Sequence, residues 1–91
     1  MSIEVRIPTI LRTYTAGEKA VHGEGATLLQ VIDDVEARHP GLKARIVEEA
    51  GLRRFVNVYV NDEDVRFTGA LDTPVKDGDS VTVLPAVAGG C

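Results

Sequence analysis

The chain has 91 residues, a length that supports one domain with one modest core and excludes a second. Its formal net charge of −4 argues against nucleic-acid binding, which requires a basic surface for the phosphates. No apolar run approaches a membrane span and no signal pattern opens the chain, so we expect a cytoplasmic protein with no membrane contact. One cysteine and two separated histidines exclude an internal disulfide and a metal site, so we expect no bound metal and no self-contained enzyme.

The first half of the sequence predicts two strands followed by a helix. Apolar and polar residues alternate over residues 3–7, which indicates a half-buried strand closed by Pro8. A second strand is expected around residues 19–22. Thr27 and Gln30 then have the spacing of a capping box that begins a helix. The apolar residues that follow have the spacing of one buried helical face: Leu28, Val31, Ile32 and Val35.

The second half predicts strands and turns with little further helix. Pro40 and Gly41 end the long helix. The remaining elements are a helical turn over 42–50, a strand over 54–60, turns over 61–64 and 77–79, and a last strand over 80–84. This order indicates an α+β fold in which a mixed sheet packs on one main helix. Its order and size resemble the β-grasp fold of ubiquitin-like proteins.

The strand over 54–60 suggests a surface that could bind other proteins. If its valines point toward the helix, then Phe55, Tyr59 and Leu84 point toward solvent. Aromatic residues on such a face can simply stabilise cross-strand pairs. They can also form an apolar docking patch beside the end of the last strand. The residues alone leave both interpretations open.

The sequence ends in two glycines and a cysteine, Gly89, Gly90 and Cys91. Glycine adopts nearly any backbone conformation and permits close approach, so such a tail can be threaded into the active site of a partner. Pro85 would end the last strand and direct the chain away from the domain. We therefore expect a domain over residues 1–84 and a flexible tail over 85–91. The residues expected to enter a partner are Ala86, Val87, Ala88, Gly89 and Gly90.

Three segments, residues 7–12, 54–67 and 77–90, carry a resemblance that spans nearly the whole chain. In the third, a turn, a strand and a Gly-Gly tail follow one another as in β-grasp sulfur carriers. That family includes the small subunit of molybdopterin synthase and the thiazole-biosynthesis carrier. The first two segments resemble the actinobacterial CysO-type branch of cysteine biosynthesis more than the shorter thiazole carrier. The residues at 87–90 are shared with molybdopterin synthase small subunits, so the tail alone does not separate these two.

This resemblance implies chemistry at the carboxylate of Gly90. A ubiquitin-activating-type enzyme would use ATP to join the carboxylate to AMP, and a sulfur nucleophile would then displace AMP to leave a thiocarboxylate. In the CysO-type pathway this group donates sulfur to an activated serine on a PLP-dependent cysteine synthase. The carrier itself would bind no cofactor and act as a co-substrate of its partners. Nothing in the sequence indicates an oligomer, so we expect a monomer.

Cys91 departs from the mature pattern, because its peptide bond leaves Gly90 without a free carboxylate. It could be the product of an S-to-N shift that follows sulfur transfer, with the new cysteine now bonded to Gly90. It could also be an encoded precursor residue, or a residue added artificially. In the first two cases a zinc-dependent JAMM-type metalloprotease would remove it. A catalytic cysteine is disfavoured, because neither histidine lies in a recognisable partner motif.

Other functions stay open on the sequence. A molybdopterin synthase small subunit, or a carrier for another sulfur-containing metabolite, would share the chemistry and differ in its partner. A ubiquitin-like modifier would instead join Gly90 to lysines of target proteins. A β-grasp interaction domain with an inert tail would need neither reaction, since terminal residues are often frayed.

Overall fold

The computed structural model describes residues 2–49, 51–53 and 56–85. Its strands are β1 (Ile3–Arg6), β2 (Ala20–Gly23), β3 (Val47–Glu48), β4 (Gly51–Leu52), β5 (Val56–Val60), β6 (Glu63–Asp64) and β7 (Ser80–Pro85). Its helices are α1 (Leu28–Arg38), α2 (Leu42–Ile46) and three 3₁₀ helices, η1 (Thr9–Thr15), η2 (Val65–Phe67) and η3 (Ala70–Asp72).

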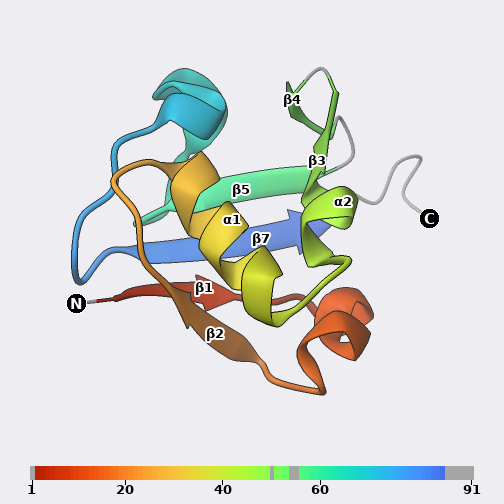
Figure 1. Cartoon of the computed structure of the whole chain (residues 1–91). Coiled ribbons are helices and arrows are strands. Elements are labelled where there is room, and N and C mark those ends of the chain that lie inside the picture. Colours follow the sequence, from red (N-terminus) through yellow and green to blue (C-terminus); the bar gives the residue numbers. More distant parts are fainter. Residues whose placement is uncertain (1, 50, 54–55, 86–91) are drawn as a thin grey trace.

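Five of these strands form a mixed sheet in the order β2-β1-β7-β5-β6. The β1 and β7 strands are parallel, and the other neighbours in the sheet are antiparallel. The α1 helix crosses one face of this sheet, and α2 lies beside it (Figure 1). The predicted α+β arrangement of a mixed sheet on one main helix is therefore confirmed.

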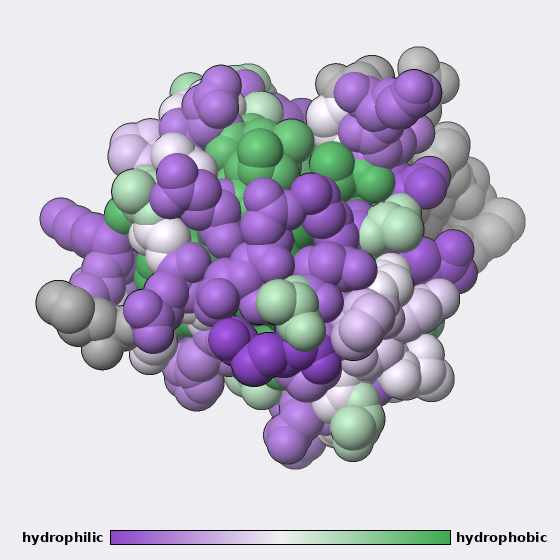
Figure 2. All heavy atoms as spheres, viewed as in Figure 1, coloured by the Kyte–Doolittle hydropathy of each residue, from purple (hydrophilic) through white to green (hydrophobic). Residues whose placement is uncertain are grey.

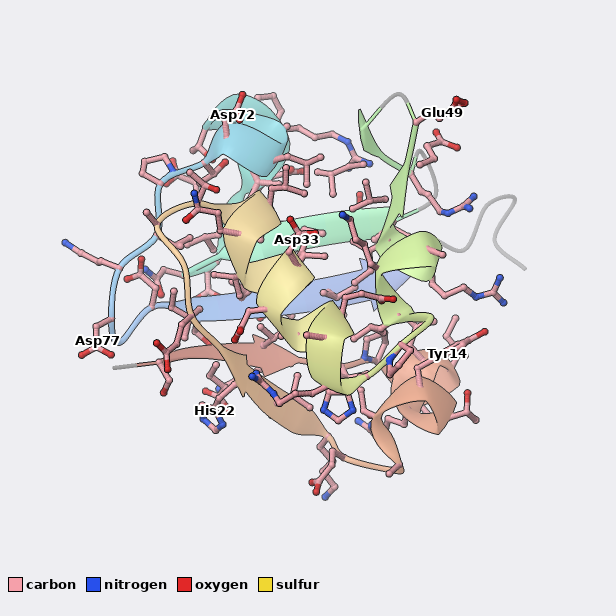
Figure 3. All side chains as sticks on the ribbon, in the orientation of Figure 1. Tyr14, His22, Asp33, Glu49, Asp72 and Asp77 are labelled. Atoms are coloured by element: carbon pink, nitrogen blue, oxygen red, sulfur yellow. The ribbon has the colours of Figure 1, made fainter. Side chains whose placement is uncertain are left out.

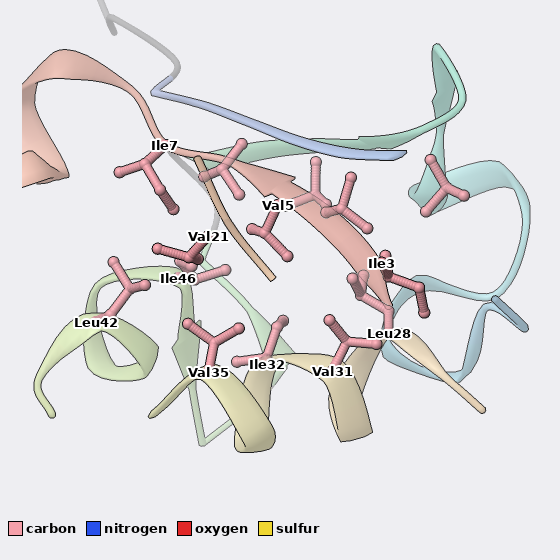
Figure 4. Close-up of a cluster of buried hydrophobic side chains, with 14 of the residues drawn as sticks. Ile3, Val5, Ile7, Val21, Leu28, Val31, Ile32, Val35, Leu42 and Ile46 are labelled. Carbon is pink, nitrogen blue, oxygen red and sulfur yellow. The ribbon is translucent and has the colours of Figure 1, made fainter. Parts of the chain in front are cut away.

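The hydrophobic core fills the space between the sheet and α1. Alternate residues of the strands point inward, as their period of two requires. The α1 helix supplies the apolar face that its spacing predicts, and Leu28 and Val31 are fully buried. Figure 4 shows these side chains packed between the helix and β1. The opposite side of α1 carries charged residues, and the face of the molecule in Figure 2 is mostly hydrophilic.

The start of α1 is fixed by the two side chains that the capping box predicts. Thr27 Oγ1 accepts the backbone N–H of Gln30 at 3.3 Å. Gln30 Oε1 accepts the N–H of Ala26 at 2.8 Å, one residue before the N-cap, where a standard box would use the N-cap itself. At the other end His39 is the C-cap, and its N–H donates to the carbonyl of Val35. The helix therefore begins and ends where the sequence predicts.

Three elements differ from the sequence-based expectations. The η1 helix, which packs Leu11 into the core, was not predicted. The helical turn expected over 42–50 ends at Ile46, because the next residues form the β3–β4 hairpin. Gly51 has a φ of +123° in that hairpin, a conformation that favours glycine. The turn expected over 61–64 includes the short strand β6, and fully buried Val65 then begins η2.

Within the described residues, no helix is long and apolar enough to cross a membrane.

Candidate functional site

The predicted tail begins at the C-terminal end of β7, in the middle of the sheet. The β7 strand pairs with β1 on one side and with β5 on the other. It extends one residue beyond the predicted strand, because Pro85 lies opposite Val56. We call Leu84 and Pro85 the tail root. The pairing with β1 ends at Thr82, whereas β5 pairs with the chain as far as Pro85 (Figure 1).

The residues expected to carry the chemistry lie outside the part of the chain that the structure describes. These are the predicted threaded segment, the predicted reaction site and the predicted removable residue: Ala86, Val87, Ala88, Gly89, Gly90 and Cys91. Their roles stay predictions. What the structure supplies is the setting of the tail root and the surface around it.

Two of the three predicted patch residues share the outer face of the sheet. Leu84 lies opposite Asn57, and Tyr59 lies opposite Thr82. Leu84 and Tyr59 are therefore diagonal neighbours on adjacent strands, within reach of a large side chain. Leu84 is 45% exposed and Tyr59 is half-buried, whereas Phe55 lies outside the described residues. Their role in docking stays a prediction, now with a defined position beside the tail root.

Arg66 joins η2 to the beginning of β5, and sequence reasoning missed it. Its Nη1 donates to Asn57 Oδ1 at 2.7 Å. Its Nη2 donates to the carbonyls of Val56 at 2.6 Å and Arg53 at 3.2 Å. Val56 is the residue opposite Pro85, so this guanidinium fork fixes the strand that holds the tail root.

Two carboxyl groups with a lowered pKa lie away from the tail root. The pKa of Asp79 falls mainly because the Asn61 side chain donates to it, and also because the Lys76 backbone N–H does. The pKa of Glu36 falls because the backbone N–H groups of Lys43 and Gly41 donate to it. Both carboxylates close loops of the fold, so neither perturbed pKa marks the tail root as a site of acid–base chemistry.

An open cleft of about 570 Å³ lies between β2 and α1, and two of its charged side chains, Arg38 and Asp34, have structural partners. Arg38 donates to the carbonyl of His22 and pairs with Asp34 at 3.1 Å. Asp34 also accepts the N–H of Glu24 at 3.0 Å. Within the described ranges, no group of histidine, cysteine and carboxylate side chains could hold a metal ion. The α1 side chains therefore cap the open edge of β2.

Comparisons with known proteins match nearly the whole chain. The sequence profile of the ThiS family matches residues 5–90. The sulfur carrier protein CysO of Mycobacterium tuberculosis is 56% identical, over 99% of this chain and 100% of its own length. A chain of the crystal structure of the Amycolatopsis orientalis BexX/CysO complex superposes with a TM-score of 0.93 at 67% identity, covering 97% of this chain and 99% of that one. Small archaeal modifier protein 3 of Haloferax volcanii is 33% identical over 99% of this chain and 100% of its own. The predicted ubiquitin-like β-grasp fold and the resemblance to CysO-type carriers are both confirmed.

Proposed function

Because the chain belongs to the ThiS family, we propose that the carboxylate of Gly90 is adenylated and then converted to a thiocarboxylate. The chain is a CysO-type sulfur carrier of cysteine biosynthesis and not an enzyme. The thiocarboxylate would be the form in which it carries the sulfur. The family match through Gly90 is the observation that carries this proposal, since it includes the Gly-Gly pair and stops before Cys91.

The two steps balance with co-reactants that the partners supply. A carboxylate oxygen of Gly90 attacks the α-phosphorus of ATP, and pyrophosphate leaves. A sulfur nucleophile then attacks the acyl carbon, the C–O bond to AMP breaks, and AMP leaves. The carrier contributes no acid or base of its own to either step. Its part is to present one carboxylate on a tail whose root pairs with β5 in the middle of the sheet.

The resemblance to CysO-type carriers implies the partners of this proposal. A ubiquitin-activating-type enzyme would use ATP for the adenylation, and a PLP-dependent cysteine synthase would accept the sulfur. A zinc-dependent JAMM-type protease would remove Cys91 and free the carboxylate. The complex of the Amycolatopsis relative with BexX supports a carrier that works by binding other proteins. We place the carrier in the cytoplasm as a monomer.

One relative favours a second candidate function, a ubiquitin-like protein modifier. The Haloferax protein named a modifier is 33% identical over nearly the whole chain. In that function the activated Gly90 would be attacked by a lysine of a target protein instead of by sulfur. Conjugates of higher mass in a host lysate would support it, and a thiocarboxylate without conjugates would exclude it.

Intact-mass measurement tests the proposal directly. The purified chain is incubated with the JAMM-type protease, the adenylating enzyme, ATP and a sulfide source. We expect a product that has lost Cys91 and has one oxygen replaced by sulfur at Gly90. The matched control omits ATP and should yield only the chain that ends at Gly90 with an ordinary carboxylate. A chain that gains no sulfur in the complete mixture would overturn the proposal.

A further inference from the structure

A cleft of about 340 Å³ lies beside the tail root. The end of β1 and the segment that leads into η1 form one wall, and the last residues of β7 form the other. These segments come together because β1 and β7 are parallel neighbours, with Arg6 opposite Thr82. Leu84, which directly precedes the predicted tail, lines this cleft and is 45% exposed. Any protein that encloses the tail must therefore approach the cleft.

Of the described residues that line the cleft, only Arg6 and Arg12 are charged. Arg6 has one ion pair within the described residues, with Glu4 at 3.9 Å, and its side chain is 63% exposed. A pair this long and exposed contributes little. Arg12 donates its Nε–H to the carbonyl of Ile7 at 3.2 Å, and its Nη groups make no hydrogen bond within the described ranges. Two guanidinium groups with N–H donors to spare thus line one cleft of a chain whose net charge is −4.

We propose that this cleft binds an acidic segment of the protein that receives the tail. A carboxylate of that segment pairs with Arg6 and Arg12, and an adjacent apolar side chain packs on Leu84. The planar guanidinium fork suits a carboxylate, and opposite charges at an interface speed the encounter and set its orientation. The inference rests on the proposed function, because the acidic segment would belong to the partner's surface around the channel that the tail enters.

The test compares charge reversals at the two ends of the sheet. The chain ending at Gly90 is supplied to its ubiquitin-activating-type enzyme, and ATP–pyrophosphate exchange is measured against carrier concentration. Arg6→Glu should raise KM about five- to tenfold with kcat preserved, since a reversed charge repels the acidic segment. Lys76→Glu makes the same charge change in the loop before β7, at the other end of the sheet, and should leave KM near the wild-type value.

The salt dependence of KM separates loss of this ion pairing from a structural defect, because a structural defect would not change it. The KM of the wild type and of Lys76→Glu should rise with salt, whereas the KM of Arg6→Glu should depend on salt much less. Arg6→Gln should fall between the wild type and Arg6→Glu. Equal KM values and equal salt dependence for Arg6→Glu and Lys76→Glu would overturn this inference alone. Absence of exchange with the wild type would overturn the proposed function, and this inference with it.

Discussion

The two ends of the sheet are built in different ways. At the end away from the tail root, polar groups satisfy one another. Asn61 donates to Asp79 Oδ1 at 3.0 Å and accepts the backbone N–H of Ser80 at 3.0 Å. Asp79 also accepts the N–H of Lys76 at 2.9 Å, and Asp77 accepts the N–H of Ser2 at 2.6 Å. Figure 3 shows Asp77 at this end, beside the first residues of the chain.

At the end that carries the tail root, three of the polar side chains are arginines. Arg66 binds the carbonyls at the start of β5, while Arg6 and Arg12 keep N–H donors available in the cleft. Leu84 adds exposed apolar surface between them. The far end therefore fixes its loops with local hydrogen bonds, and the tail root keeps groups that a second protein can bind. It follows that substitutions in the far loop and at the two cleft arginines, Arg6 and Arg12, should change stability and partner binding separately.

The largest effect should come from deleting Gly89 and Gly90. The variant has no glycine carboxylate to present, so we expect complete loss of adenylation in the exchange assay. Its thermal midpoint should match that of the full chain, because the core is made by the preceding residues. A truncated chain that is still adenylated would show that the reaction does not need the Gly-Gly pair and would return the tail to an inert role.

Sequence periodicity predicted the elements whose buried residues recur at the regular spacing of a helix or a strand. The helix that begins after Thr27 and the outward position of Tyr59 and Leu84 follow from periods of 3.6 and two residues. The η1 helix and the β3–β4 hairpin escaped prediction because contacts from the rest of the fold determine them. Arg66 left no signal, because it binds backbone carbonyls and every residue has one.

The cleft beside the tail root could not be predicted from the sequence either. Its two walls are far apart in the chain, and only the parallel pairing of β1 with β7 brings Arg6 beside Thr82. Alternation predicts that Arg6 faces outward, but it does not predict which strand lies next to it. The reaction at Gly90 was predicted from the motif and the resemblance, and that prediction needs no knowledge of the cleft.

An intermediate effect is expected for Arg66, the residue that links the fold to the tail root. Arg66→Ala removes donors from the carbonyls of Val56 and Arg53 and should lower the free energy of unfolding by about 1–3 kcal/mol, measured by urea denaturation. We also expect a lower kcat/KM for adenylation under conditions where the variant is fully folded, because Val56 holds Pro85.

Two further variants separate positioning by Arg66 from a general loss of stability. Arg66→Lys keeps the charge but not the fork, so it should recover only part of both losses. Phe67→Ser changes the adjacent residue, which is 85% exposed, and should alter stability by less than about 0.5 kcal/mol. An Arg66→Ala variant that loses stability but keeps full kcat/KM would limit Arg66 to the fold and leave the tail root independent of it.

The smallest effect should appear at the far end, as a change in acid sensitivity. The pKa of Asp79 is lowered in the folded chain, first by the Asn61 side chain and then by the Lys76 N–H. A lowered carboxyl pKa stabilises the fold above the unfolded value of about 4, and this contribution is lost as the pH falls through the folded value. In urea denaturation from pH 7 downward, Asp79→Asn should therefore lose less stability below about pH 4 than the wild type.

The same variant tests whether the two ends of the sheet are independent. Asn61 donates to Oδ1 of Asp79 and the Lys76 N–H donates to Oδ2, so asparagine at position 79 keeps only one of these two hydrogen bonds while the charge is removed. Because this loop lies at the opposite end from the cleft, the KM for adenylation at pH 7 should be unchanged. An acid slope equal to that of the wild type would show that Asp79 does not contribute. A raised KM would show that the far end also influences partner binding, and the separation of stability from docking would then fail.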